Sequence, residues 1–360
     1  MLAVGLMLTL TAIPVAAAAG WWVPAPIGSR SISAVASNQG SATLAISKGV
    51  PGWYRPTSGS FSPLAVPGAV SAPGPAAAVA ARGGVGVAAY RSGLLLQVSQ
   101  GGGSRRLPSV PGVPRALALV GGDPQLLAVA TSRGLFSGRL GSRLALVAAG
   151  EGRAVIPPPH AGRAWLALVD GRLWDRSAGG GWARAPGSPR FDRQTQAVAE
   201  LSTGVILVGE PGGLIWRGDR GRWDRALQLL PYGGLGGVPQ VTALVADGAT
   251  SAYLGTEGFG TLLTTDAGYT WYRAAPSDRS ISSLATVGPV FAAHAHGFVV
   301  AISAGGVFLH RLQALPAPPI YGPTSQTMEL VGTAVVTLLA ALLVTLLLWF
   351  LTRRQRRLSV

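Results

Sequence analysis

The chain has 360 residues, with 29 basic and 14 acidic side chains that give a formal charge of +15, and it contains no cysteine. Disulfide bonds, thiolate metal sites and cysteine nucleophiles are therefore excluded. Hydrophobic residues make up 48% of the chain, and its 51 glycines together with only 12% charged residues predict a folded protein of short strands and turns.

Residues 1–20 are predicted to be a signal peptide or an N-terminal anchor. Leu2 to Ala19 is an apolar run, and it ends in Ala16-Ala17-Ala18-Ala19-Gly20, which is the small-residue pattern of a signal-peptidase site. Because no lysine or arginine precedes the run, an uncleaved anchor stays open as the alternative. Either outcome places the following domain outside the cytoplasm. The +15 charge then predicts attraction to anionic partners other than nucleic acid.

A pattern of apolar strand, turn, apolar strand, glycine turn and polar hairpin recurs along residues 27–312. Such a period of about 40 residues predicts an all-β fold, a β-propeller of about seven four-stranded blades. A sandwich or two smaller barrels is the alternative, but the similar spacing of Trp182, Trp223 and Trp271 favours radial repetition. Residues 21–26 are either a spacer or the start of the first blade. The seven predicted units are 31–53, 76–106, 115–144, 153–182, 195–223, 241–271 and 281–311.

Arginines gather around two of the predicted loops and hairpins, and on one face they would form a patch suited to carboxylates or phosphates. The alternative is that each hairpin arginine points outward and is solvated on its own. We predict this patch as a candidate site for an anionic partner, and its members are Arg184, Arg190, Arg193, Arg217, Arg220, Arg222 and Arg225.

The segment from Thr264 to Trp271 predicts one particular tight hairpin turn. The Asp266 carboxylate and the hydroxyls of Thr264 and Thr270 are expected to bond backbone N–H groups, while Gly268 takes a positive φ at no steric cost. Trp271 is expected to pack beneath the hairpin. These five residues are thus predicted to be structural. Weakened copies are expected at Asp175, Ser177, Gly179 and Trp182, and at Asp219, Gly221 and Trp223.

This segment resembles an Asp-box, the repeat motif of BNR and sialidase-type β-propellers. The resemblance extends to the photosystem II assembly and stability factors, exported propellers that hold a membrane-protein client on an arginine-rich surface. It implies a propeller fold and one of two activities, glycoside hydrolysis or partner binding. Hydrolysis requires two carboxylates placed at the substrate, and Glu151, Glu200, Glu210 and Glu257 are candidates for which the spacing identifies no partner. We therefore predict that binding, and not catalysis, is the function.

His294 and His296 are the weak metal candidates, because residues two apart on a strand face the same side. A zinc site needs three or four protein ligands, and no third ligand can be named. We predict no metal and no cofactor, and we interpret the two histidines as a polar patch.

The C-terminal residues predict a membrane anchor. Residues 313–329 are proline-rich, and this composition predicts a stiff spacer. Residues 330–352 are predicted to be a transmembrane helix, because the apolar run from Val331 to Leu351 has about the 20 residues needed to span a bilayer. The tail, 353–360, carries four arginines, which by the positive-inside rule places it in the cytoplasm.

Together these features predict a single-pass protein of the cytoplasmic membrane with its propeller outside. Its expected function is that of a scaffold or assembly factor that binds a membrane or envelope protein client. The alternatives are a sialidase-like glycoside hydrolase and a non-catalytic module that binds glycans in adhesion.

Overall fold

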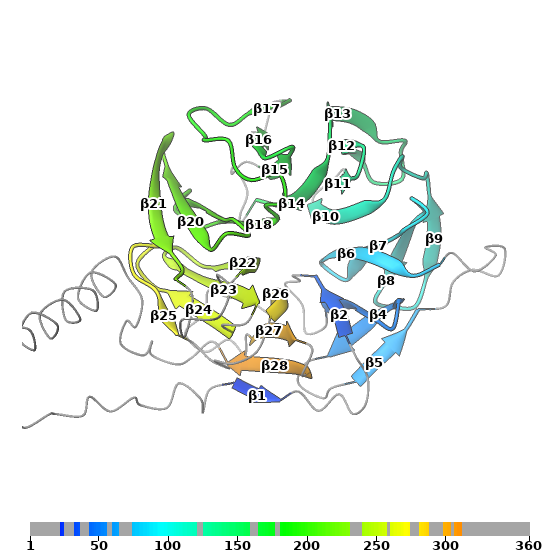
Figure 1. The fold of residues 1–360 in the computed structure, drawn as a ribbon. Helices are drawn as coiled ribbons and strands as arrows, with labels where there is room; N and C mark the ends of the chain where they lie inside the picture. Colours follow the sequence, from blue (N-terminus) through cyan, green and yellow to red (C-terminus); the bar gives the residue numbers. More distant parts are fainter. Residues whose placement is uncertain are drawn as a thin grey trace, which may run out of the picture.

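The protein is an all-β propeller in the computed structural model, as the sequence predicts (Figure 1). The structure describes residues 22–24, 32–36, 43–55, 60–64, 74–120, 125–158, 165–176, 181–230, 240–257, 260–273, 281–287, 298–303 and 306–311. The predictions for residues 1–20 and 313–360, and for His294 and His296, lie outside these residues. Within the described part of the chain, no helix has the length and apolarity to cross a membrane.

Six four-stranded sheets are each built from four consecutive strands, and we call them blades 1 to 6. Blade 1 has β2 (Ile32–Val35), β3 (Thr43–Ser47), β4 (Val50–Arg55) and β5 (Ser60–Pro63). Blade 2 has β6 (Ala76–Arg82), β7 (Val85–Tyr90), β8 (Leu95–Ser99) and β9 (Ser104–Leu107). Blade 3 has β10 (Pro114–Val120), β11 (Leu126–Thr131), β12 (Gly134–Arg139) and β13 (Ala145–Ala149).

The next three blades follow the same path. Blade 4 has β14 (Gly152–Ile156), β15 (Trp165–Val169), β16 (Arg172–Arg176) and β17 (Trp182–Arg184). Blade 5 has β18 (Ala197–Glu200), β19 (Ile206–Gly209), β20 (Leu214–Asp219) and β21 (Arg222–Gln228). Blade 6 has β22 (Gln240–Asp247), β23 (Ser251–Glu257), β24 (Gly260–Thr264) and β25 (Tyr272–Arg273).

A further four-stranded sheet, the composite blade, joins the two ends of the propeller. It contains β26 (Ile281–Val287), β27 (Phe298–Ser303), β28 (Gly306–Arg311) and, at its outer edge, β1 (Trp22–Pro24) from the start of the chain. Trp22 pairs with His310 and Pro24 with Phe308. Residues 22–24 are therefore part of the propeller, which begins before the predicted boundary at residue 27. The sequence left this open because the pairing joins residues almost 300 positions apart.

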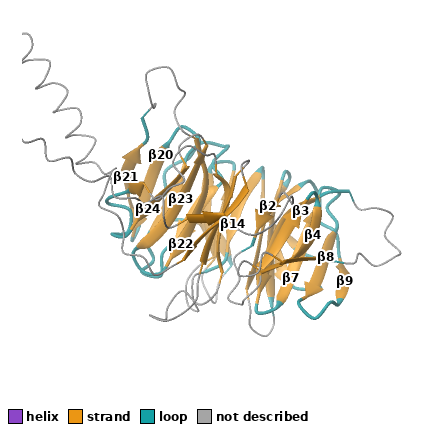
Figure 2. Cartoon of the chain, turned by 90° about the horizontal axis from the view of Figure 1, so that it is seen from below, coloured by secondary structure: helices purple, strands orange, loops and turns teal. Residues whose placement is uncertain are grey.

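The innermost strands form a closed ring. Strands β2, β6, β10, β14, β18, β22 and β26 contact one another in this cyclic order, and β26 contacts β2 (Figure 1). This single ring excludes the alternative of a sandwich or two barrels. Because strands alternate in direction, the turns between first and second and between third and fourth strands all lie on one face, which we call the turn face. The remaining turns and the interblade connections lie on the opposite, connector face; loops line both faces in Figure 2.

The hydrophobic core lies between blades. Each of five clusters draws buried residues from two neighbouring blades, from blades 1 and 2 through to blades 5 and 6. Second strands such as β3 (Thr43–Ser47) and β15 (Trp165–Val169) are buried at every position, because a neighbouring blade covers each side. Apolar runs of four to seven residues therefore mark these strands in the sequence, as in other sheets that are buried on both faces.

Hydrogen bonds repeat at the connector face and fix each blade to the next. The carbonyls of Gly49, Gly93, Arg133, Gly171 and Gly213 lie in the turns between second and third strands of blades 1 to 5. They accept hydrogen bonds from the backbone N–H groups of Ala76, Val110, Gly150, Phe191 and Leu229, respectively. Gly171 has a φ of 69°, and a Cβ there would lie 2.2 Å from the Phe191 carbonyl oxygen. These hydrogen bonds fix the connection that leaves each blade against a turn of that blade.

Blade 6 contains a partly buried carboxyl group, that of Asp247, whose raised pKa should make the stability of the protein depend on pH. Burial raises the pKa of Asp247 from 3.8 to about 6, and burial together with the charge of Asp247 raises the pKa of Tyr253. The raised pKa of Asp247 favours its neutral form in the folded state. Its contribution to stability is therefore fully present below pH 3.8 and is lost as the pH rises through about 6.

We expect the Asp247→Asn variant to raise the free energy of unfolding at pH 7 by about 2 kcal/mol, since one pKa unit corresponds to about 1.4 kcal/mol and partial exposure reduces the full value. The gain should shrink toward zero as the pH falls to 4. Urea denaturation between pH 4 and 7.5 measures this, with Asp224→Asn as the control because Asp224 is exposed. An equal gain in both variants, or none at pH 7, would contradict the assignment.

Candidate functional site

The Thr264–Trp271 turn has the hydrogen bonds that the sequence predicts. The Thr264 hydroxyl oxygen accepts from the Gly268 N–H (2.8 Å), and Asp266 Oδ1 accepts from the Thr270 N–H (2.8 Å). One contact differs, because the Thr270 hydroxyl donates to Asp266 Oδ2 (2.5 Å) instead of bonding a backbone group. Gly268 has a φ of 92°. Trp271 is fully buried among residues of blades 5 and 6, so the turn is a structural element.

The predicted weaker copies of this turn differ from it. Asp219 and Arg222 pair across a two-residue hairpin in which Arg220 and Gly221 have φ values of 48° and 80°. The Asp219 carboxylate contacts Arg217, with an Oδ2 to Nη2 distance of 3.4 Å, and this hairpin is a different turn. In the other copy, Ser177 and Gly179 lie outside the described residues.

Arg217 does not belong to an exposed patch. Its side chain is 8% exposed, and its Nε donates to the Ala267 carbonyl (3.0 Å) in the turn of blade 6. Its guanidinium also stacks 4.2 Å from the centre of the Tyr269 ring. The predicted role is therefore corrected, because this arginine joins blades 5 and 6.

The other six arginines of the predicted patch are exposed, but the fold does not bring them to one face. Arg190 and Arg193 lie in the connection between blades 4 and 5, on the connector face, whereas Arg220 and Arg222 lie at the turn face. Arg184 and Arg225 stack on tryptophans, Trp174 (5.8 Å) and Trp216 (5.4 Å), of their own blades. The predicted single patch is split between the two faces and the outer edge.

A different pair of arginines lies at the inner rim of the connector face. The register between first and second strands shifts near the start of six inner strands, so that one residue is left as a β-bulge. The bulged positions are Ser33, Ala77, Arg115, Arg153, Thr242 and Ser282. β-Bulges re-aim a side chain and occur often next to functional sites. Arg115 and Arg153 thus occupy equivalent positions in blades 3 and 4.

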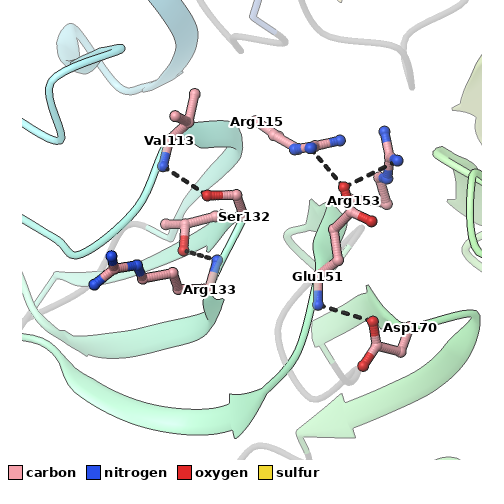
Figure 3. Close-up of polar contacts among 8 residues, drawn as sticks. Val113, Arg115, Ser132, Arg133, Glu151, Arg153 and Asp170 are labelled. Atoms are coloured by element: carbon pink, nitrogen blue, oxygen red, sulfur yellow. Dashed lines mark hydrogen bonds and ion pairs between the residues drawn. The ribbon is translucent and has the colours of Figure 1, made fainter.

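These two arginines share one carboxylate (Figure 3). Glu151 Oε1 lies 2.5 Å from Arg115 Nη2 and 3.0 Å from Arg153 Nη2. The ion pair with Arg115 crosses from blade 4 to blade 3. The three side chains are between a fifth and a third exposed, and surface ion pairs of this kind contribute only about 0–1 kcal/mol to stability. Within this group of three side chains, two guanidinium groups face one carboxylate.

The backbone around Glu151 is held by the neighbouring turn. The Glu151 N–H donates to Asp170 Oδ1 (2.9 Å), and the Asp170 N–H donates to the Glu151 carbonyl (3.0 Å) (Figure 3). Asp170 and Gly171 have φ values of 49° and 69°, as in the two-residue hairpin turns that favour Asp-Gly. Gly150 has no side chain to obstruct this contact, since a Cβ there would lie 2.2 Å from Asp170 Oδ2. The backbone that carries the carboxylate between the arginines is therefore held in place.

The rim cluster of Arg115, Glu151 and Arg153 can bind an anion. The Arg153 Nε is buried and makes no hydrogen bond within the structure, and each guanidinium offers five N–H donors. A planar guanidinium binds a carboxylate or phosphate through two parallel hydrogen bonds. Among the described residues, no group of three or more His, Asp or Glu side chains could hold a metal ion.

The four glutamates that are candidate catalytic residues lie on two different faces of the propeller, and at least two of them bind other groups of the protein. Glu200 is the last residue of β18, at the turn face, and is buried. Glu210 directly follows β19 and Glu257 is the last residue of β23, so both lie at the connector face. Glu210 Oε1 accepts a hydrogen bond from the Asp192 N–H (3.2 Å). Glu151 is bound by the two arginines. Glu200 therefore lies on the face opposite to Glu151, Glu210 and Glu257 and forms no pair with any of these three.

Sequence reasoning missed Arg115 and Arg153 because it searched for clusters of arginine along the chain. Each is a single arginine, and 37 residues separate them. Their shared position within the repeat unit could have identified them, because each arginine is the first residue of a predicted unit and precedes an alanine and an apolar strand.

No family model matches the chain, and no curated protein matches it. Its fold is similar to those of solved structures. YCF48 bound to D1 peptide is 14% identical, with a TM-score of 0.60 over 81% of this chain and 94% of that chain. YCF48 from Cyanidioschyzon merolae is 13% identical, with a TM-score of 0.57 over 81% and 98%. The extracellular domain of a hybrid two-component system from B. thetaiotaomicron is 12% identical, with a TM-score of 0.59 over 81% and 40%.

Proposed function

We propose that this chain is a membrane-anchored, extracytoplasmic β-propeller that binds a protein client, as a scaffold or assembly factor at the cell envelope. The observation that carries the proposal is the rim cluster, in which arginines from adjacent inner-strand bulges share one carboxylate. An acidic side chain or a chain terminus of the client would bind Arg115 and Arg153, in competition with Glu151. The likeness of the fold to YCF48 bound to D1 peptide supports a propeller that binds a polypeptide.

The proposed attachment and location rest on the sequence. The apolar runs Leu2–Ala19 and Val331–Leu351 flank the propeller, and the arginine-rich tail follows the second run. The resemblance of Thr264–Trp271 to an Asp-box is part of the same proposal, because that resemblance extends to a family of exported propellers. No geometric feature of the described residues favours the glycosidase or glycan-binding alternative.

The test is capture of clients by the full chain, solubilised from its native membrane in a mild detergent. We expect the double variant Arg115→Glu/Arg153→Glu to reduce recovery of the co-purifying proteins at least tenfold, because one charge-assisted hydrogen bond contributes about 1.5–3 kcal/mol. The Glu151→Gln variant should retain or increase recovery, since it removes the internal competitor. Quantitative mass spectrometry of the purified complexes measures both.

The matched control is Arg220→Glu/Arg222→Glu, which makes the same change of charge at exposed positions of the opposite face. Unchanged recovery in this variant is expected. Loss of clients here, together with retention in the rim variant, would transfer the binding site to the hairpin arginines. A wild-type chain that recovers no defined protein, or an ectodomain that releases sugar from glycosides, would overturn the proposed function itself.

A further inference from the structure

The two ends of the propeller chain leave it side by side. Trp22 starts β1 and pairs with His310, one residue before the end of β28 at Arg311. In the composite blade these positions lie at the turn face, because β28 is a third strand and runs toward that face. The apolar runs predicted to enter the membrane, Leu2–Ala19 and Val331–Leu351, thus connect to the same face.

Three exposed arginines lie on the turn face at the junction of blades 2 and 3. Arg139 ends β12 and Arg143 lies in the following turn. Arg105 reaches toward them from β9 of blade 2, where its Nη2 donates to Gln97 Oε1 (2.9 Å). Gly141 lies between Arg139 and Arg143, and a Cβ at Gly141 would be 2.8 Å from Arg105 Nη2. The missing side chain leaves the space that this guanidinium occupies, and we call the three residues the edge triad.

Acidic residues do not balance the edge triad. The first 150 positions of the sequence contain eleven basic residues but only one acidic residue, Asp123, which lies outside the described residues. The ion pairs Arg115–Glu151, Arg153–Glu151 and Arg217–Asp219 do not involve the triad. Arg55 and Arg82 add charge to the turn face of blades 1 and 2. Blade 6, by contrast, has Asp247, Glu257 and Asp266 against Arg273.

We propose that the turn face lies against the membrane and that the edge triad binds the headgroups of anionic phospholipids. This inference rests on the membrane attachment in the proposed function. The predicted C-terminal membrane helix attaches the propeller at the composite blade, and the triad lies three blades away around the ring, so the two contacts together orient the whole face. Guanidinium groups bind phosphates through paired hydrogen bonds, and a negatively charged leaflet attracts arginines that lie within a Debye length. The connector face, with its rim cluster, then points away from the bilayer.

The absence of cysteine allows a direct test with the full chain reconstituted into vesicles. A single cysteine is introduced at exposed Ser142, between Arg139 and Arg143, and is labelled with an environment-sensitive fluorophore. Ser92→Cys is the matched control, because Ser92 is exposed in a turn of blade 2 on the connector face. Vesicles contain phosphatidylcholine with or without phosphatidylglycerol, and a headgroup spin label on the lipid quenches nearby probes.

We expect the probe at position 142 to be quenched in vesicles with phosphatidylglycerol and not in phosphatidylcholine alone, and the probe at position 92 in neither. High salt should abolish the quenching. The variant Arg105→Gln/Arg139→Gln/Arg143→Gln should lower the equilibrium constant for binding of the turn face to the membrane surface. The expected decrease is roughly a hundredfold, at about fivefold per surface arginine. The corresponding triple lysine variant should retain quenching, because it keeps the charge and tests for misfolding.

The outcomes separate this inference from the proposed function. Failure of the chain to float with phosphatidylcholine vesicles would refute the membrane attachment on which both depend. Flotation with an unquenched probe at position 142, or equal quenching at positions 92 and 142, would overturn the orientation alone. Equal quenching at 142 in both lipid mixtures would show that the triad does not select anionic headgroups. Crosslinking of position 142 to an acidic polypeptide, without lipid quenching, would replace the lipid by a protein partner.

Discussion

The Trp271→Ala variant is expected to lower the free energy of unfolding by about 3–5 kcal/mol, which is the range for removing a fully buried large aromatic side chain. Trp271 is completely buried where the turn of blade 6 meets blade 5, and its Nε1 donates to the Gly268 carbonyl (3.2 Å). Truncation would therefore leave a cavity and an unpaired carbonyl together. Urea denaturation followed by circular dichroism measures the loss.

Two further variants locate the effect. Trp271→Phe keeps most of the ring volume and should cost less than the alanine variant. Asp266→Ala removes the acceptors of Thr270 N–H and Thr270 hydroxyl and should destabilise the turn by about 2 kcal/mol. In both, amide hydrogen exchange should rise first in β24 and in the adjoining strands of blade 5. A Trp271→Ala protein that unfolds within 1 kcal/mol of the wild type would refute the structural assignment of this turn.

The sequence predicts this turn because its determinants are local. Asp266, Gly268 and Trp271 act within eight residues, so residue types at fixed spacing are sufficient to specify the hydrogen bonds. Apolar runs likewise predict the inner strands, because a strand covered on both faces tolerates few polar residues. The positive φ of Ala267, 61°, was not foreseen, because alanine gives no sign of it in a sequence.

The features that the sequence did not predict depend on contacts between distant residues. β1 pairs with a strand almost 300 positions away, so no local pattern assigns residues 22–24 to the last sheet. The rim cluster arises because strand register leaves Arg115 and Arg153 as bulges in neighbouring blades. Clustering along the chain instead indicated the arginines of the predicted patch, but the alternation of strand direction places Arg190 and Arg193 on the face opposite to Arg220 and Arg222. Arginines that are close in the sequence can therefore lie on different faces of a propeller, and arginines that are distant in the sequence can share one site.

The two faces of the propeller therefore have separate chemistry. The connector face holds arginines that already share a carboxylate and suit exchange with another one, whereas the edge triad on the turn face lacks a described acidic partner. A protein that attaches to the membrane on its turn face and binds on its connector face would present the rim cluster to a client at a fixed height above the bilayer. This division makes the two binding proposals separable by variants that lie on different faces.

Arg217→Ala is expected to lower the free energy of unfolding by about 2–4 kcal/mol, although the residue lies next to a hairpin rich in solvated arginines. It would remove the charge-assisted hydrogen bond to the Ala267 carbonyl, which is worth about 1.5–3 kcal/mol, and the stacking on Tyr269, worth about 0.5–2 kcal/mol. It would also remove the buried stem that packs between blades 5 and 6. Equilibrium unfolding in urea measures the change, and hydrogen exchange should show the loss at that junction.

The control is Arg220→Ala, three positions along the chain, where the exposed side chain predicts a change within about 0.5 kcal/mol. Arg217→Lys should recover only part of the loss, because an ammonium group lacks the planar fork that serves the carbonyl and the ring at once. High salt should leave the cost of Arg217→Ala nearly unchanged, since buried contacts are screened less than exposed ones. If Arg217→Ala were as mild as Arg220→Ala, the side chain would be free for an anionic partner, and the patch predicted from the sequence would regain its central member.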